Sequence, residues 1–273
     1  MLVGRLAVRS RVLTPSSLGR DGFSLRYARR MDLSGKVAVV TGGAVRVGRA
    51  VVLGLAAAGA DVFVHYGRSD EAAKATAIEV EQLGVRAAIG SVDLARPAHA
   101  GAVIEQAEAA LGPVSLLVNS ASAFPFDTVG DLDFETWQRT LDLTLSSPVF
   151  ATQAFADRLP ADLEGAVVNV TDARTTKPYR KHFSYMVARG GIDTFTRAAA
   201  LELAPSIRVN AVALGVILPP EGQEESYEHR LAARLPLARV GGTDPVVDSV
   251  LFLMRNDFIT GEIIRVDGGG HLT

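Results

Sequence analysis

The sequence of 273 residues contains no cysteine, has few lysines and lacks any long apolar run. Without cysteine the chain forms no disulfide and offers no thiol nucleophile. A membrane-spanning helix needs roughly 18 consecutive apolar residues, so we expect a soluble, cytoplasmic protein that does not bind a membrane. The formal net charge of −2 gives no bulk electrostatic attraction to nucleic acid. We therefore expect a small-molecule substrate, and we assign no metal site.

Arginine is unevenly distributed, because residues 1–30 contain many arginines and only one acidic residue, Asp21. An arginine-rich, acid-poor leader is typical of an organellar transit peptide, which would change the compartment. The alternative is an upstream start codon, since Met31 opens a natural domain sequence. In both cases the segment lacks the apolar periodicity of a core, and we expect it to be loosely ordered. The folded domain is predicted to span residues 31–273.

A glycine-bearing turn follows the first apolar segment of this domain. The stretch TGGAVRVGRA, Thr41–Ala50, lies after the apolar run Lys36–Val40 and before a segment with helical spacing. A strand, a tight turn and a helix in this order direct backbone N–H groups and the positive end of a helix dipole at an anion. Gly48 lets a ligand or the strand approach the helix closely. The pattern predicts a phosphate-binding loop, although on its own it also fits an ordinary strand-to-helix turn.

Short apolar strands alternate with helical segments along the rest of the domain. The expected strands are residues 36–40, 61–66, 85–93, 114–122, 166–173, 207–214 and 262–268. The expected helices after the glycine turn include residues 71–83, 97–111, 134–158 and 184–203. This alternation predicts an α/β fold, a single Rossmann-like doubly wound parallel sheet of about seven strands with helices on both faces. Ligands of such sheets bind at the carboxyl ends of the strands.

Six segments in this order resemble the short-chain dehydrogenase/reductase family, from Met31 to Thr273. They are TGGAVRVG, Asp93, NSAS at 119–122, YMVAR with Tyr185, IRVNAVALG at 207–215, and the TG and VDGG pieces within 260–269. Within the family the details resemble pteridine reductases. The features in question are Arg46 in the glycine motif, HYGRS at 65–69, NSASAF at 119–124 and VTDA at 170–173. The resemblance implies a dinucleotide cofactor and a homotetramer.

Charge at the end of the second strand predicts which cofactor binds. NAD-binding folds place an acid there for the ribose hydroxyls, whereas this chain has Arg68 and Ser69, and Asp61 begins the strand instead. Arg68 together with Arg46 can pair with a 2′-phosphate, which favours NADP(H). The alternatives are a solvated Arg68 and a Ser69 that caps the next helix. With the roles implied by the resemblance, the residues assigned to the cofactor are Thr41, Gly42, Arg46, Val47, Gly48, His65, Arg68, Ser69, Asp93, Asn119, Ser120, Ala121 and Gly215.

The resemblance places the chemistry at Tyr185, with Asp172 and Arg189 as partners. A phenol has an ordinary pKa of about 10, so proton donation at neutral pH benefits from a nearby cation. The family has a lysine where this chain has Arg189, which keeps the charge but cannot release a proton. Asp172 occupies the family's usual serine position, as it does in pteridine reductases. It can steer the tyrosine hydroxyl and pass a proton to a ring nitrogen; alternatively it only caps the following turn.

Phe124 and Ser122 are the candidate substrate contacts, because Phe124 can stack a flat ring against the nicotinamide. The alternative places Phe124 in the core. Residues 216–236, a long insertion after a strand, are predicted to form a substrate lid. We predict an NADPH-dependent oxidoreductase that transfers a hydride to a pterin-type C=N bond. The alternatives are a carbonyl or 3-oxoacyl reductase, and a catalytically weak NADP-binding protein, which Arg189 favours. Three departures from the family pattern put turnover in doubt: Thr144, Arg189 and Leu214.

Overall fold

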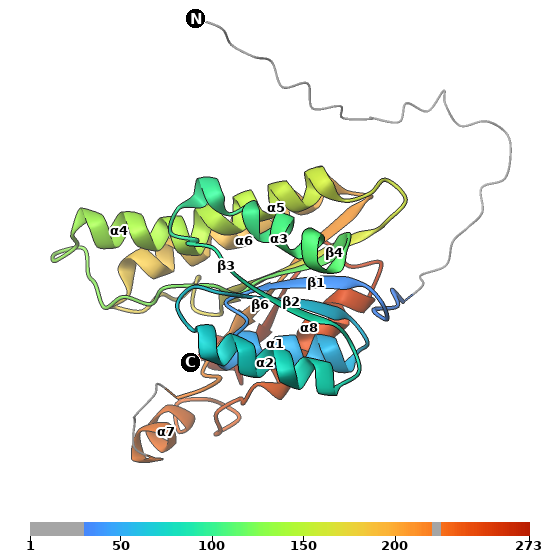
Figure 1. Cartoon of the computed structure of the whole chain (residues 1–273). Coiled ribbons are helices and arrows are strands. Elements are labelled where there is room, and N and C mark those ends of the chain that lie inside the picture. Colours follow the sequence, from blue (N-terminus) through green and yellow to red (C-terminus); the bar gives the residue numbers. More distant parts are fainter. Residues whose placement is uncertain (1–29, 220–224) are drawn as a thin grey trace, which may run out of the picture.

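The computed structural model describes residues 30–219 and 225–273, in which a parallel sheet lies between two layers of helices (Figure 1). The predicted leader, residues 1–30, lies almost entirely outside the described residues. The strands are β1 (Val37–Thr41), β2 (Asp61–Tyr66), β3 (Ala87–Ser91), β4 (Val114–Asn119), β5 (Gly165–Asp172), β6 (Ile207–Leu214) and β7 (Ile263–Val266). Their order is β3-β2-β1-β4-β5-β6-β7, and each neighbouring pair is parallel. The predicted doubly wound parallel sheet is confirmed.

Helices cover both faces of the sheet, as the alternation of segments predicts. They are α1 (Arg46–Ala57), α2 (Asp70–Gln82), α3 (Ala102–Leu111), α4 (Phe134–Leu141), α5 (Ser147–Arg158), α6 (Phe183–Leu203), α7 (Glu225–Ala232) and α8 (Asp244–Arg255). Helices α1, α2 and α8 form one layer, and α3, α5 and α6 form the other (Figure 1). Within the described residues, no helix combines the length and apolar character that a membrane span requires.

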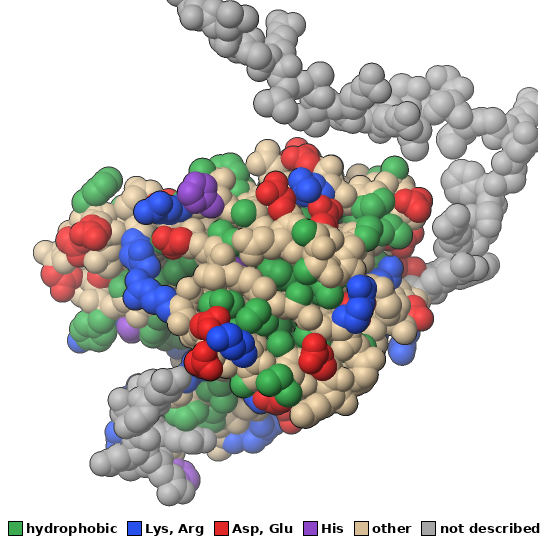
Figure 2. All heavy atoms as spheres, viewed as in Figure 1, with side chains coloured by type: hydrophobic (Ala, Val, Ile, Leu, Met, Phe, Trp, Pro, Cys, Tyr) green, Lys and Arg blue, Asp and Glu red, His purple; other side chains and the backbone are tan. Residues whose placement is uncertain are grey.

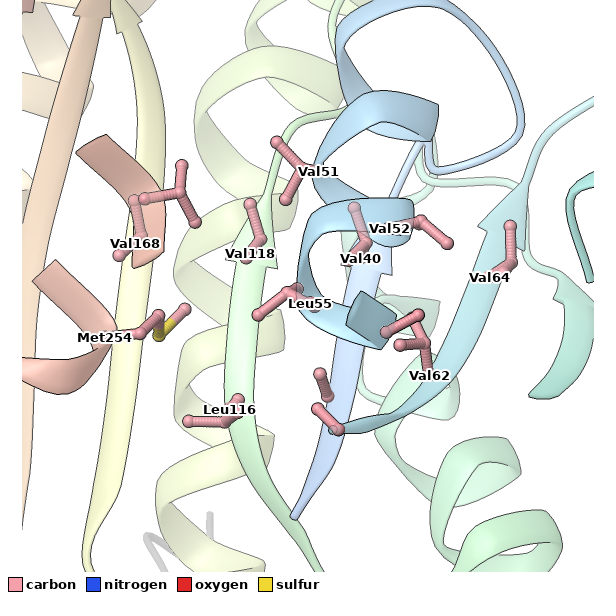
Figure 3. Packing of buried hydrophobic residues seen from close by; sticks show 14 of the residues in the cluster. Val40, Val51, Val52, Leu55, Val62, Val64, Leu116, Val118, Val168 and Met254 are labelled. Carbon is pink, nitrogen blue, oxygen red and sulfur yellow. The ribbon is translucent and has the colours of Figure 1, made fainter. Parts of the chain in front are cut away.

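The hydrophobic core on the α1 side of the sheet holds the strands in place. Leu55 of α1 and Met254 of α8 point at apolar side chains of the central strands, including Val118 of β4 and Val168 of β5 (Figure 3). All of these residues are buried. Fully burying a side chain of this size contributes about 1.5–3 kcal/mol, so the sheet is a stable base for loops at its carboxyl edge.

Two departures from the predicted elements have a local physical cause. The predicted helix 134–158 is interrupted by a π-helical turn, Asp142–Ser146. Pro148 follows it and has no N–H to bond the carbonyl of Thr144, so the regular α-helical ladder is broken there. The predicted strand 114–122 ends at Asn119, because the next two backbone N–H groups bind a side chain of β1.

The segment after β6 contains two helices. The predicted lid, residues 216–236, includes α7 in its second half, while residues 220–224 lie outside the described residues. Helix α8 follows and was not among the predicted helices. Its apolar residues Val246, Val250 and Leu253 are fully or almost fully buried, so it completes the helix layer beside α1.

Candidate functional site

The glycine turn lies at the carboxyl end of β1 and is shaped by close backbone contacts. Gly42 has φ 65, a left-handed value that favours glycine. A Cβ atom on Gly48 would lie 2.1 Å from the carbonyl oxygen of Gly42, so the first turn of α1 packs directly on the loop. Helix α1 begins at Arg46, at the end of this turn. The predicted order of strand, tight turn and helix is therefore present.

His65 holds the glycine turn in place from β2. Its Nδ1 accepts a hydrogen bond from the Gly42 N–H at 3.2 Å, and its carbonyl accepts one from the Gly43 N–H at 2.8 Å. The Nε2–H donates to the Val92 carbonyl at 2.9 Å, which requires the neutral tautomer protonated on Nε2. His65 is 2% exposed, and burial lowers the pKa of its imidazole. Its side chain therefore fastens the turn to the strands beside it.

A cleft of about 430 Å³ opens beside this turn, along the carboxyl ends of β1 to β4. Six of the predicted site residues line it: Gly42, His65, Arg68, Asp93, Ala121 and Ser122. Among the further lining residues that the sequence analysis did not assign to the site are Arg139 of α4 and Leu143 of the π turn. Their position depends on how α4 packs across the cleft, which no local pattern specifies.

Of the two arginines predicted to bind the 2′-phosphate, Arg68 lines the cleft. Arg46 has a left-handed backbone with φ 53, and its Nη2 donates to the Pro219 carbonyl at 3.0 Å, beyond the end of β6. Arg46 is not among the residues that line the cleft. Ser69 precedes α2 but makes no side-chain cap hydrogen bond, which removes the capping alternative for its hydroxyl. Val47 is half-buried against the core on the α1 side.

Thr41 and Asn119 organise the ends of β1 and β4. The Thr41 hydroxyl oxygen accepts the N–H groups of Ser120 at 3.0 Å and Ala121 at 3.1 Å. The Asn119 side chain points into the buried helix layer, where its Nδ2 donates to Thr152 at 3.2 Å and to Asn169 at 2.9 Å. Asn119 is thus absent from the residues that line the cleft, in contrast to the expectation.

Gly215, also assigned to the cofactor, has a packing role in this structure. A Cβ atom there would lie 2.6 Å from the Cα of Asp267, so only glycine fits between the loops after β6 and β7. Gly215 lines a second cavity instead of the cleft beside the glycine turn.

Tyr185 and Asp172 meet at the carboxyl end of β5, as predicted. The Tyr185 hydroxyl donates to Asp172 Oδ2 at 2.9 Å, and the Arg174 N–H donates to Asp172 Oδ1 at 2.7 Å. Both side chains are buried. Burial raises the pKa of Asp172, and burial, opposed by the charge of Arg189, raises the pKa of Tyr185 to about 12. The phenol is therefore protonated at neutral pH and able to donate.

Arg189 lies one helical turn after Tyr185 and faces the ring of the tyrosine. Its Cζ is 5.2 Å from the ring centroid, and its Nη1 donates to the Val170 carbonyl at 2.5 Å. The side chain is 4% exposed, and its Nε has no hydrogen-bond partner among the described residues. Arg189 therefore places a positive charge beside the phenol, and its guanidinium does not release a proton.

Phe124 lies against Tyr185 and is 56% exposed, which excludes the core alternative. Its ring meets that of Tyr185 edge to face, with centroids 4.7 Å apart, and stacks on His182 at 3.7 Å. The Ser122 hydroxyl lies 3.4 Å from the hydroxyl of Thr144, which also accepts the Ala123 N–H at 3.2 Å. The π turn thus holds the loop that carries both predicted substrate contacts.

Three residues that lie around the first turn of α6, Asp127, Tyr179 and His182, were missed by the sequence analysis. Asp127 is buried and accepts the N–H of Ser184 at 3.2 Å as well as its hydroxyl. The His182 ring binds the Pro125 carbonyl through Nδ1 at 2.6 Å. Tyr179 lies near Phe124, with ring centroids 6.3 Å apart. The sequence shows a group of aromatic residues before Tyr185, but this pattern does not specify which contacts they make.

Comparisons with known proteins agree over most of the chain. The family profile described as Enoyl-(Acyl carrier protein) reductase matches residues 43–271. L-xylulose reductase from Bos taurus is 33% identical over 88% of this chain and 98% of its own length. The 3-oxoacyl-[acyl-carrier-protein] reductase of Synechocystis sp. is 30% identical over 87% and 97%. The structure of FolM alternative dihydrofolate reductase 1 from Brucella canis complexed with NADP is 37% identical with a TM-score of 0.84, covering 89% and 96%.

Proposed function

Because the chain belongs to the short-chain dehydrogenase/reductase family, we propose that it uses NADPH to reduce a C=N bond of a small flat pterin-type ring. The observation that carries this proposal is the Tyr185 hydroxyl bonded to the buried carboxylate of Asp172, with the exposed ring of Phe124 against it. The similarity to the FolM alternative dihydrofolate reductase supports the same substrate class.

The residues present fit NADPH. Backbone N–H groups at the start of α1 suit the pyrophosphate, and Arg68 in the cleft suits the 2′-phosphate. The unpartnered Nε–H of Arg189 is a buried donor of the kind that a ribose hydroxyl satisfies. When bound, NADPH supplies the hydride, and the protein supplies orientation and the proton.

The proton leaves from the Tyr185 hydroxyl. Its pKa of about 12 keeps it protonated at neutral pH, and the hydrogen bond to Asp172 Oδ2 fixes the direction of the O–H. The charge of Arg189 opposes the rise in this pKa and so stabilises the phenolate that forms. Asp172, whose own pKa is raised by burial, is placed to take up a proton from solvent and pass it to the phenolate oxygen.

Two other functions compete with this one. Relatives named as L-xylulose and 3-oxoacyl reductases favour reduction of a carbonyl group, but a carbonyl reductase calls for a neutral hydroxyl at position 172. Arg189 in place of lysine favours a catalytically weak NADP-binding protein. In that case the guanidinium would block the cofactor ribose instead of binding it.

A screen of NADPH oxidation separates these functions. Wild-type protein is assayed with dihydrobiopterin, dihydrofolate and a panel of ketones and 3-oxoacyl thioesters, in parallel with Arg189→Lys. We expect modest reduction of the dihydropterins by the wild type and little turnover of the ketones. Faster reduction of a ketone would replace the pterin function with the carbonyl one. Activity in Arg189→Lys alone, or in neither protein, would favour the NADP-binding protein for the wild type.

A further inference from the structure

A second cavity, of about 190 Å³, adjoins the catalytic pair on the side away from the cleft described above. Its walls include Arg174 and Tyr179 from the loop between β5 and α6, and Gly215 after β6. Arg234, just after α7, lines it from the lid. Arg174 is also the residue whose backbone N–H binds Asp172, so this cavity begins two residues from the catalytic carboxylate.

The loop between β5 and α6 is strongly basic. Residues 174–182, RTTKPYRKH, contain two arginines and two lysines and no acid, although the whole chain has a net charge of −2. Like charges at this density repel one another, which costs stability unless an anion neutralises them. The positive charge is therefore concentrated beside the reacting groups.

Arg174 is held in a defined position at the cavity wall. Its Nε–H donates to the Lys177 carbonyl at 2.9 Å, and its Cζ lies 5.3 Å from the ring centroid of Tyr179. A guanidinium fixed in this way loses little further entropy when it binds a carboxylate or phosphate.

The acidic side chain in the cavity wall, Asp267, does not pair with Arg174. Asp267 accepts the N–H groups of Gly269 at 3.0 Å and His271 at 2.8 Å, and it also binds the His271 ring at 2.7 Å. Both oxygens of the Asp267 carboxylate therefore accept hydrogen bonds from the turn after β7. Arg174 and Arg234 are the two basic side chains of the cavity wall, and among the described residues neither forms an ion pair with Asp267.

We propose that the substrate carries an anionic chain on its flat ring, and that Arg174 and Arg234 bind the anion in this cavity. The proposal rests on the reductase function proposed above and adds the chemical class of the substrate's tail. A carboxylate and a phosphate satisfy the same guanidinium geometry, so the two sources are separated by experiment.

The test compares ring compounds that differ in the charge of their tails. Dihydrobiopterin has a neutral side chain, dihydrofolate has carboxylates and dihydroneopterin phosphate has a phosphate. We expect kcat/KM about tenfold or more higher for at least one anionic compound, mostly through KM, with the advantage lost at high salt. The anionic compound that has the higher kcat/KM shows whether the site binds a carboxylate or a phosphate. Equal kcat/KM for all three would overturn the anion site and leave the reductase function standing.

Variants localise the effect. Arg234→Gln and, independently, Arg174→Gln should lower the ratio of kcat/KM for the anionic compound to that for dihydrobiopterin by about tenfold each. Arg180→Gln is the matched control, because Arg180 is exposed on the same loop and does not line the cavity. An equal decrease of this ratio in all three variants would show a general effect of positive charge and would contradict a specific anion site. If no compound is reduced, the proposed function fails. Calorimetric affinities of the same compounds in the presence of NADP⁺ then test the anion site, through the ratio of the affinity for the anionic compound to that for dihydrobiopterin.

Discussion

The two halves of the site are built differently. At the glycine turn, buried and neutral groups bind one another, as His65 does with Gly42 and Thr41 does with Ala121. Around Tyr185 the rings of Phe124 and Phe126 are 56% and 67% exposed. Figure 2 shows Lys and Arg side chains distributed among Asp and Glu side chains over this face of the molecule. We call the first part the cofactor half, which is held by internal hydrogen bonds, and the second the substrate half, which leaves aromatic surface that a ligand can cover.

The largest effect is expected from removing the proton donor of the substrate half. Tyr185→Phe should lower kcat for pterin reduction by a factor of about 10²–10⁴, because a positioned acid contributes this much to proton transfer. NADPH affinity, measured by fluorescence titration, should change little, since the hydroxyl binds Asp172. An unchanged rate in this variant would contradict the mechanism.

The next largest effect should lie in the cofactor half. Gly48→Ala would place a Cβ atom 2.1 Å from a backbone oxygen that cannot move away, so the loop must shift. We expect a loss of about 1–3 kcal/mol in the free energy of unfolding, together with weaker NADPH binding. Gly190→Ala is the control, because nothing lies within 4 Å of a Cβ there and the site is helical. Denaturant unfolding of both variants checks the contrast; equal losses would contradict it.

Removing a positive charge from the cleft should produce a smaller effect, a change in the preference for NADPH over NADH. Arg68→Ala should reduce the preference for NADPH over NADH by about tenfold, the effect of one charge-assisted contact with the 2′-phosphate. Arg46→Ala should alter this preference less, since Arg46 reaches Pro219 instead of the cleft. Titrations with both cofactors provide the measurement. Equal affinity of the wild type for NADPH and NADH would refute the assignment.

The smallest effect is a dependence on pH that belongs to the cofactor half. Burial lowers the folded-state pKa of His65 below its unfolded value near 6.5. The unfolded state therefore binds the proton first, and stability falls as pH drops below about 6.5, by at most about 1.4 kcal/mol per pH unit, until the folded pKa is reached.

A difference measurement isolates this contribution. Asp172, with its raised pKa, acts in the opposite direction, since its contribution is lost as pH rises through that pKa. The difference in unfolding free energy between wild type and His65→Gln removes this common term. The difference should shrink from pH 7 to pH 5, and a constant difference would show that His65 does not titrate in this range.

Local patterns and family resemblance predicted the sheet, the glycine turn and the pairing of Tyr185 with Asp172. These features depend on periodicity and on strand ends that a parallel sheet necessarily brings to one edge. The side-chain directions of Arg46 and Asn119 were not predictable, because each depends on a distant partner: Pro219 in one case, and the helices beside β4 in the other. The anchors of the Phe124 loop were missed for the same reason, since Asp127 and α6 are far apart in sequence.

The central claim is that hydride passes from NADPH to a pterin ring held between the two halves. The most direct test uses NADPH carrying deuterium at the transferred position, with dihydrobiopterin and dihydrofolate as substrates, and mass spectrometry of the product. The account predicts a tetrahydropterin heavier by one deuterium from wild-type protein, and almost none from Tyr185→Phe. Tetrahydropterin without deuterium, or no tetrahydropterin from the wild-type protein, would contradict it.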